Sequence, residues 1–293
     1  MPRSTSRDRA AADRDAIRIG LIGASVPSAV NDIMRSLGPR LRLSCVYEPV
    51  RFLSPLVAEE AGVVAVDSLT KLGTRRGIQA AVVHAAGSLG VHLARPLLKA
   101  GLPILWFGAT ALGSQWRSLL DLDDRGPIVP LVADRYTGST LRLRELMTGP
   151  LGPARTIEAT FSQTDEAADL IATLDWCRWV SQPRIARTNT WQWTFRAASG
   201  RETVADVRPL ADGEDPNGGR HVVCELGEAI VHEDSLTWRR DGDADWTQAD
   251  LSDEREAVEV AADLFARRVV GGLVPVASIA EIVEIAREVD PMT

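Results

Sequence analysis

One stretch near the start of the chain, "IRIGLIGASVPSAV" (residues 17–30), restricts the fold more than any other. Apolar residues fill Ile17–Ile22 and a glycine follows, as in the first strand and phosphate-binding loop of a dinucleotide-binding fold. Such a loop normally has three glycines: one for the turn, one for close approach of the backbone to pyrophosphate, and one for helix–strand packing. Here Gly23 fills the first place, whereas Ser25 and Ser28 occupy the other two.

The chain continues with apolar strands and helices in alternation. Further strands are expected at 41–47, 63–66, 78–86 and 103–108, and helices at 26–37, 51–61, 68–72 and 91–100. Strands separated by helices of this length form a parallel sheet with right-handed crossovers. We therefore predict an α/β Rossmann-like dinucleotide-binding domain over residues 17–134, with function in the loops at the carboxyl ends of its strands.

The pattern changes in the second half of the chain. A helix expected at 138–148 is followed by runs rich in Thr, Trp, Val and Arg at 154–162, 187–197, 202–210, 220–233 and 235–240, and two helices close the chain at 252–271 and 278–289. Successive strands joined by short turns form an antiparallel sheet. Residues 135–293 are therefore predicted to form an α+β domain with an open-faced, mainly antiparallel sheet.

Composition excludes several classes of protein. A chain of 293 residues has the length of two domains, and its net charge of -7 argues against a nucleic-acid or anionic-membrane partner. The sequence has no apolar run of about 18 residues, the minimum for a transmembrane helix. Residues 1–16 hold four Arg and three Asp but no apolar h-region of a signal peptide, and they are interpreted as a disordered tail. The widely spaced cysteines Cys45, Cys177 and Cys224 predict reduced, buried thiols of a cytoplasmic protein.

No metal site is expected. His221 and Cys224 are close in sequence, but positions three apart in a strand point to opposite faces of the sheet. The acidic stretch Asp241–Trp246 begins like a calcium-binding loop, yet Trp246 stands where that loop requires glycine. It is interpreted as a turn between strands.

Five segments, in their order along the chain, resemble one known family. They are "IRIGLIGAS" (17–25), "DSLTKL" (67–72), "LLKAGLPIL" (97–105), "RYTGSTLRLRELMTGPLGPARTIEATF" (135–161) and "LDWCRWV" (174–180). Together they resemble the glucose–fructose oxidoreductase and inositol dehydrogenase (Gfo/Idh/MocA) family over nearly the whole chain beyond residue 16. The resemblance implies a Rossmann domain joined to an open-faced sheet domain. It also implies an NAD(P)-dependent oxidoreductase that acts on a carbohydrate-like or other small polar substrate.

The resemblance places a nicotinamide cofactor on a defined set of residues. These are Gly23, Ala24, Ser25, Val26 and Ser28 in the loop, Glu48 after the second strand and Gly87 after the fourth. An acid 25 residues beyond the first loop glycine is placed to bond the ribose hydroxyls of NAD, and it would repel the 2′-phosphate of NADP, so NAD is the preferred cofactor. The alternative is that the loop is only a strand-to-helix turn and Glu48 a solvated glutamate.

The catalytic motifs of the family are not reproduced. Where the family has Glu-Lys-Pro, this chain has Phe107, Gly108 and Ala109. Aligning the last Asp of the family pattern D-x-G-x-H-x-x-D on Asp175 places Ala172 at the histidine. None of the residues in the lysine and histidine places can transfer a proton. The catalytic residues are therefore unassigned, and Asp175 is expected to brace the fold rather than to catalyse.

Three interpretations remain open. The chain is an oxidoreductase, or a non-catalytic relative that uses the fold for binding, regulation or oligomer assembly, or a dehydrogenase whose base has moved to His92 or Asp169. The Trp-rich run Arg187–Ala197 is predicted to expose an apolar patch, and such patches mark contacts. A homo-oligomer assembled through the C-terminal sheet is therefore expected.

Overall fold

The computed structural model describes residues 16–24, 27–85, 87–107, 127–162, 166–181, 184–211 and 219–289. The chain forms two compact units, each of which is considered by itself. One unit comprises the residues up to Leu131 together with Val258–Ile279, and the other comprises Val132–Ala257 and the residues from Ala280 on. Within the described ranges, no helix combines the length and the apolar character needed to cross a membrane. The expected N-terminal tail lies outside these ranges, except for residue 16.

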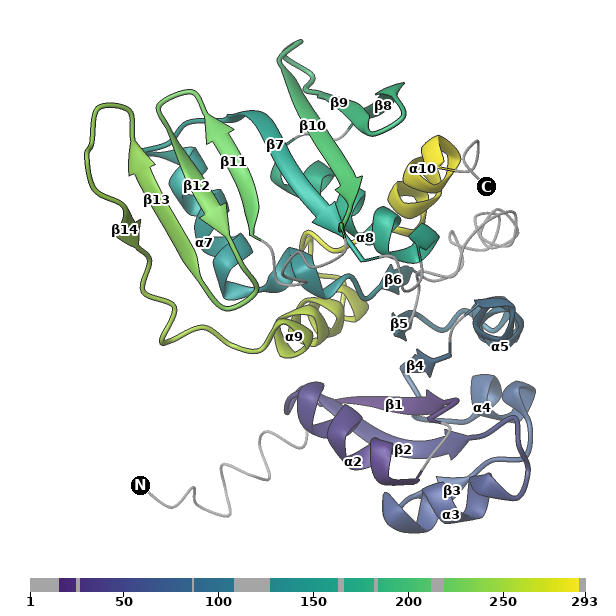
Figure 1. Ribbon diagram of the computed structural model, residues 1–293. Coiled ribbons are helices and arrows are strands. Elements are labelled where there is room, and N and C mark those ends of the chain that lie inside the picture. Colours follow the sequence, from purple (N-terminus) through teal and green to yellow (C-terminus); the bar gives the residue numbers. More distant parts are fainter. Residues whose placement is uncertain are drawn as a thin grey trace, which may run out of the picture. The chain divides into compact units, whose positions relative to one another are not determined.

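The first unit is built on a six-stranded parallel sheet with the strand order β3-β2-β1-β4-β5-β6 (Figure 1). Its strands are β1 (Ile17–Ile22), β2 (Leu41–Tyr47), β3 (Val64–Ala65), β4 (Ala80–His84), β5 (Ile104–Phe107) and β6 (Ile128–Pro130). Between them lie α2 (Pro27–Ser36), α3 (Leu53–Glu60), α4 (Leu69–Thr74) and α5 (Gly87–Lys99). The predicted Rossmann-like α/β fold is confirmed.

The core of this unit is formed by its mostly apolar strands and the helices that cover them. Leu21 and Ile22 of β1 point to opposite faces of the sheet and are both 0% exposed, as expected for a parallel strand that is covered on both faces. Helix α9 (Ala257–Val269), which comes from the far end of the chain, contributes Phe265 to the same core. Arg40 also pairs with Asp263 of α9 at 2.6 Å. The first unit is thus completed by a segment distant in sequence.

The second unit is built on an eight-stranded sheet with the order β14-β13-β12-β11-β7-β10-β9-β8. Its strands are β7 (Ala154–Phe161), β8 (Arg184–Asn189), β9 (Gln192–Arg196), β10 (Glu202–Pro209), β11 (Arg220–Cys224), β12 (Gly227–Val231), β13 (Leu236–Arg240) and β14 (Thr247–Gln248). All its described neighbours pair antiparallel except β7 and β10. The predicted open-faced, mainly antiparallel sheet is confirmed.

Helices cover one face of this sheet (Figure 1). Of these, α7 (Gly138–Thr148) packs on β12 and β13, and α8 (Glu166–Val180) packs on β7 and β10. The short helix η1 (Ala133–Tyr136) and helix α10 (Ile279–Val289) contact α8. Along β7, Ile157 and Ala159 are buried, whereas Thr156 and Glu158 between them are exposed. This alternation is typical of a sheet that is packed on one side only.

The predicted single strand at 187–197 is wrong, because the chain reverses at Thr190–Trp191 to form the hairpin β8–β9. The reason is local: Asn189 Oδ1 accepts a hydrogen bond from the Trp191 backbone N–H at 3.2 Å, which is an Asx turn. Trp193 and Phe195 are both 0% exposed. The predicted apolar surface patch is therefore wrong for these two side chains, which face the interior of the unit.

The three cysteines are buried and free, as the sequence predicted. Burial raises the pKa of the Cys177 and Cys224 thiols to about 12. Because only the thiolate is nucleophilic, these side chains are suited to packing rather than to redox chemistry.

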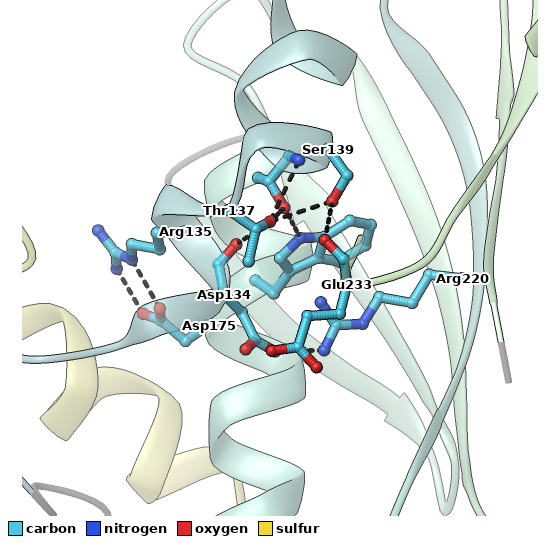
Figure 2. Close-up of polar contacts among 9 residues, drawn as sticks. Asp134, Arg135, Thr137, Ser139, Asp175, Arg220 and Glu233 are labelled. Atoms are coloured by element: carbon cyan, nitrogen blue, oxygen red, sulfur yellow. Dashed lines mark hydrogen bonds and ion pairs between the residues drawn. The ribbon is translucent and has the colours of Figure 1, made fainter. Parts of the chain in front are cut away.

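A polar cluster ties the start of α7 to its neighbours (Figure 2). Thr137 caps the helix by accepting from the Thr140 N–H at 3.2 Å, and Ser139 donates to the Glu233 carbonyl at 3.0 Å. The Trp176 indole N–H of α8 donates to Thr140 Oγ1 at 2.8 Å. These bonds fix the register of α7 against α8, which matters for the charged residues described below.

Candidate functional site

The first loop at the carboxyl edge of the parallel sheet requires glycine at position 23. Gly23 has φ 77°, in the left-handed region that side chains rarely adopt. A Cβ atom at Gly23 would lie 3.0 Å from the His84 carbonyl oxygen. Gly23 therefore makes the turn that the sequence pattern predicted. Ser25 and Val26 lie outside the described residues, and Ser28 falls in the first turn of α2.

Glu48 lies directly against this loop. It follows β2, is only 3% exposed, and accepts a hydrogen bond through Oε1 from the Ala24 N–H at 2.6 Å. A charged acceptor makes a strong bond with a backbone donor. The structure thus brings together two residues that the sequence assigned to cofactor binding, Ala24 and Glu48, and shows that Glu48 is buried rather than solvated.

A pocket of about 430 Å³ opens beside Glu48, and its walls include Arg51, Ser54 and Asp67. The Ser54 hydroxyl is buried and has no hydrogen-bond partner among the described residues. Buried polar groups are nearly always paired, so an unpaired hydroxyl in a pocket wall indicates a place for a ligand. Sequence reasoning missed Ser54, because nothing in the sequence distinguishes it from other serines near a helix start.

His84 and Phe107 end the neighbouring strands β4 and β5. They are paired in the sheet register, and their ring centroids are 5.7 Å apart. Both side chains are half-buried. His84 is thus a titratable group at the carboxyl edge, beside Phe107, which stands where the family has the glutamate of its Glu-Lys-Pro motif. Its signal in the sequence is its position as the last residue of the run "AAVVH" (80–84).

The alternative base His92 is exposed on α5, between the buried residues Val91 and Leu93. Asp169, the other alternative, lies in the first turn of α8 and is half-buried. Gly108 and Ala109 lie outside the described residues. Gly87 begins α5 with φ 62°, and its contact with a cofactor stays a prediction.

An ungapped count places a further histidine of the family at Gly90, and this chain has no room for a side chain there. A Cβ atom at Gly90 would lie 2.3 Å from Trp106 Cζ2 and 2.5 Å from the Ala85 carbonyl oxygen. Trp106 is almost fully buried, and its indole N–H donates to that same carbonyl at 2.8 Å. The Trp106 ring therefore fills the space that a side chain at position 90 would need.

We expect the Gly90→Ala variant to lower the free energy of unfolding by about 1–3 kcal/mol, because it overpacks the contact with Trp106. In an exposed helix position the same change would raise stability by about 1 kcal/mol. Chemical denaturation followed by circular dichroism measures the difference. The control is Ser88→Ala, at an exposed position of the same helix. A Gly90→Ala variant as stable as the control would contradict the packing argument.

In the second unit, Asp175 belongs to a buried ion pair with Arg135. It is 0% exposed and takes two hydrogen bonds from Arg135, one of them between Nε and Oδ2 at 2.6 Å (Figure 2). Burial raises the pKa of the Asp175 carboxyl, and the Arg135 guanidinium opposes that rise. Ala172 is one turn earlier on α8 and carries no titratable group. The pair braces α8 against η1, in agreement with the sequence prediction for Asp175.

Comparison with known proteins extends the argument from the fold. No protein-family model matches the sequence, and no curated protein matches it either. Among solved structures, UDP-N-acetylglucosamine 3-dehydrogenase GnnA from Acidithiobacillus ferrooxidans is 17% identical with a TM-score of 0.76, covering 93% of this chain and 95% of its own. Aldose-aldose oxidoreductase from Caulobacter crescentus is 11% identical with a TM-score of 0.73, covering 94% and 96%.

A third structure is biliverdin reductase from Synechocystis sp. PCC 6803, solved with biliverdin and NADP+. It is 11% identical with a TM-score of 0.69, covering 94% of this chain and 97% of its own. At identities this low, the comparison shows a shared fold only. The chain thus has the two-domain fold of the Gfo/Idh/MocA-type oxidoreductases, as the sequence resemblance predicted.

Proposed function

We propose that the protein is a nicotinamide-dependent oxidoreductase that acts on a carbohydrate-like or other small polar substrate. The observation that carries the proposal is the placement of Glu48, which bonds the Ala24 N–H of the loop and also lines the pocket that contains Ser54. The end of the second strand and the loop after the first are the places where this fold binds the ribose and pyrophosphate of a dinucleotide. The dehydrogenase, the oxidoreductase and the reductase among the similar structures support the same assignment.

The residues present fit a dinucleotide. Gly23 keeps the loop free of a Cβ atom beside the His84 carbonyl, and the Ser54 hydroxyl and Glu48 carboxylate offer polar partners to a ribose. A bound nicotinamide would supply the hydride acceptor or donor. The residues of this chain would then hold the cofactor, exclude water and move the substrate proton. The candidate for proton transfer is His84, which ends β4 beside the end of β5.

We expect NADH to bind at least about tenfold more tightly than NADPH, which corresponds to a difference of about 1.4 kcal/mol in binding free energy. The pocket presents two carboxylates, Glu48 and Asp67, and one guanidinium, Arg51. Asp67 already pairs with Lys71 at 2.7 Å, so the buried charge of Glu48 is the one that a 2′-phosphate would meet. Titration of the protein with each reduced cofactor, followed by nicotinamide fluorescence, measures both affinities.

Two variants sharpen this titration. Glu48→Gln removes the charge and should narrow the difference between NADH and NADPH. Ser25→Gly removes a side chain from the loop and should tighten the binding of both cofactors, because the second place of the loop normally holds glycine. If neither cofactor binds, the proposal fails. Preferential binding of NADPH would overturn only the role of Glu48 in repelling the 2′-phosphate.

The second candidate function is that of a non-catalytic relative that binds a cofactor or partner without turnover. The closure of the Gly90 position by Trp106 and the absence of a titratable side chain at Ala172 favour it. Cofactor binding is compatible with both functions, so a positive titration does not separate them. A turnover assay does, and it is described with His84 in the Discussion.

We also propose that the protein is a homo-oligomer assembled through the face of the eight-stranded sheet opposite α7 and α8. Apolar and polar side chains lie half-buried on this face. They include the apolar Val223 and Ile230 and the polar His221 and Glu228. His221 Nε2 and Glu228 Oε2 are 2.6 Å apart. Analytical ultracentrifugation should show a dimer or larger species, and an Ile230→Glu variant should weaken it. A monomer at high micromolar concentration would exclude this assembly.

A further inference from the structure

The helical layer of the second unit contains a pocket of about 370 Å³ that belongs to none of the sites above. Its walls come from η1, the end of α7, the end of α8 and the start of α10. Four of its residues carry N–H donors on their side chains, namely Arg135, Arg144, Arg178 and Trp179. We refer to it as the Arg144 pocket.

Two donors of the Arg144 pocket are buried without a partner among the described residues. They are Arg135 Nη1 and Trp179 Nε1. Arg135 is only 1% exposed, and Nε and Nη2 of its guanidinium are used by Asp175 (Figure 2). Figure 2 shows the third nitrogen turned away from that carboxylate. Leaving a buried donor unpaired costs about 1–3 kcal/mol, so both atoms are suited to an acceptor that enters the pocket.

Arg144 adds a positive charge with no ion-pair partner in the described part of the chain. Its guanidinium carbon lies 4.0 Å from the centroid of the Trp179 ring, and that of Arg135 lies 4.9 Å from the same centroid. The indole therefore holds two cations close together. Burial, and then the charge of Arg135, lower the pKa of Arg144. An anion between the two guanidiniums would relieve this repulsion.

The other hydroxyls of the pocket do not supply acceptors to these donors. Ser181 Oγ donates to the Cys177 carbonyl at 2.5 Å, and Thr148 Oγ1 donates to the Glu145 carbonyl at 2.7 Å. The remaining walls include the apolar side chains of Met147, Pro153 and Val180. The pocket thus combines surplus donors with an apolar surface.

Charge balance disfavours a ligand with two negative charges. Arg135 pairs with Asp175 and with Glu281 at 3.1 Å, and Arg178 pairs with Glu284 at 2.9 Å. Three carboxylates therefore already face the three guanidiniums, and a dianion such as a phosphate ester would meet Glu281 in the pocket wall. We propose that the Arg144 pocket binds a small organic carboxylate with an apolar body, whose oxygens accept hydrogen bonds from Arg135 Nη1, Arg144 and Trp179 Nε1.

Benzoate is a suitable probe, because it joins a carboxylate to an apolar ring. The indole N–H resonances of the protein report binding directly in a ¹H–¹⁵N spectrum, and the Trp179→Phe variant assigns the resonance of Trp179. We expect benzoate to shift that resonance with a Kd of about 1 mM or tighter, in the range of a ligand of this size. Benzamide, its neutral counterpart, and inorganic phosphate should bind at least about tenfold more weakly.

Arg144→Gln should weaken benzoate binding at least about tenfold, whereas Arg142→Gln should leave it unchanged. Arg142 is the matched control, because it lies exposed on the same helix and pairs with Glu145 at 2.5 Å. Since Arg144 has no ion-pair partner, its replacement should not unfold the protein, and the dispersion of the indole resonances verifies this. Unshifted Trp179 in the presence of benzoate, or equal binding by Arg144→Gln, overturns the proposal.

Two further results would also overturn it. Tighter binding of phosphate than of benzoate would exclude a carboxylate site. An oligomer seen by ultracentrifugation that is lost in Arg144→Gln and retained in Arg142→Gln would assign the pocket to an acidic side chain of a second copy instead. The readouts use no nicotinamide cofactor, so the proposal stands or fails independently of the oxidoreductase assignment.

Discussion

Replacing Arg135 by methionine is expected to lower the free energy of unfolding of the protein by about 3–5 kcal/mol. The variant removes both hydrogen bonds to Asp175, which is 0% exposed and has Glu281 as a further negative charge nearby. A carboxylate left in this place must remain charged without a partner or take up a proton, and both are costly. Denaturation in urea, followed by tryptophan fluorescence, measures the loss.

The double variant Arg135→Met/Asp175→Leu is the informative control. Replacing both partners of a buried ion pair by apolar residues is often nearly neutral, so the double variant should regain most of the stability lost by Arg135→Met. Arg142→Met, on the exposed face of α7, should change the free energy of unfolding by less than about 0.5 kcal/mol. If Arg135→Met were as mild as Arg142→Met, the pair would not brace the fold.

The parts of the fold that were predictable from sequence are those fixed by local pattern. β2 has the predicted bounds Leu41–Tyr47, and α7 the predicted bounds Gly138–Thr148. A buried parallel strand must be a continuous apolar run, and a glycine or proline marks its end. The turn at Thr190–Trp191 was missed because it depends on one Asn side chain, whereas the alternation of Trp191, Trp193 and Phe195 resembles an uninterrupted strand.

Long-range packing was not predictable from a local pattern. Nothing in the sequence of α9 indicates that Phe265 enters the core of the first unit, because an amphipathic helix fits any apolar surface. The same limit holds at the candidate site. Gly23 and Glu48 were found by their spacing, but the unpaired Ser54 hydroxyl and the contact of Trp106 with Gly90 exist only in three dimensions.

The last expected result concerns proton transfer. A secondary alcohol loses a hydride only as its hydroxyl proton is taken up, and a positioned base contributes about 10²–10⁴-fold to the rate. Phe107 stands where the family has glutamate in its Glu-Lys-Pro motif, while the neighbouring strand end carries His84, half-buried with its ring 5.7 Å from that of Phe107. We therefore expect His84→Gln to lower kcat by about 10²–10⁴-fold while the affinity for NADH stays unchanged.

The assay follows reduced nicotinamide by its absorbance with a panel of polyols and sugars. Glutamine preserves the size and hydrogen bonding of the histidine but cannot accept a proton, so a fall in kcat alone identifies proton transfer rather than cofactor binding. His92→Gln is the matched control, since His92 is exposed on α5 and should leave turnover unchanged. Equal turnover of His84→Gln and the unmodified protein would show that His84 is not the base. Among the described residues at the ends of β4 and β5, His84 is the titratable one, so cofactor binding without turnover on any substrate of the panel would favour the non-catalytic function instead.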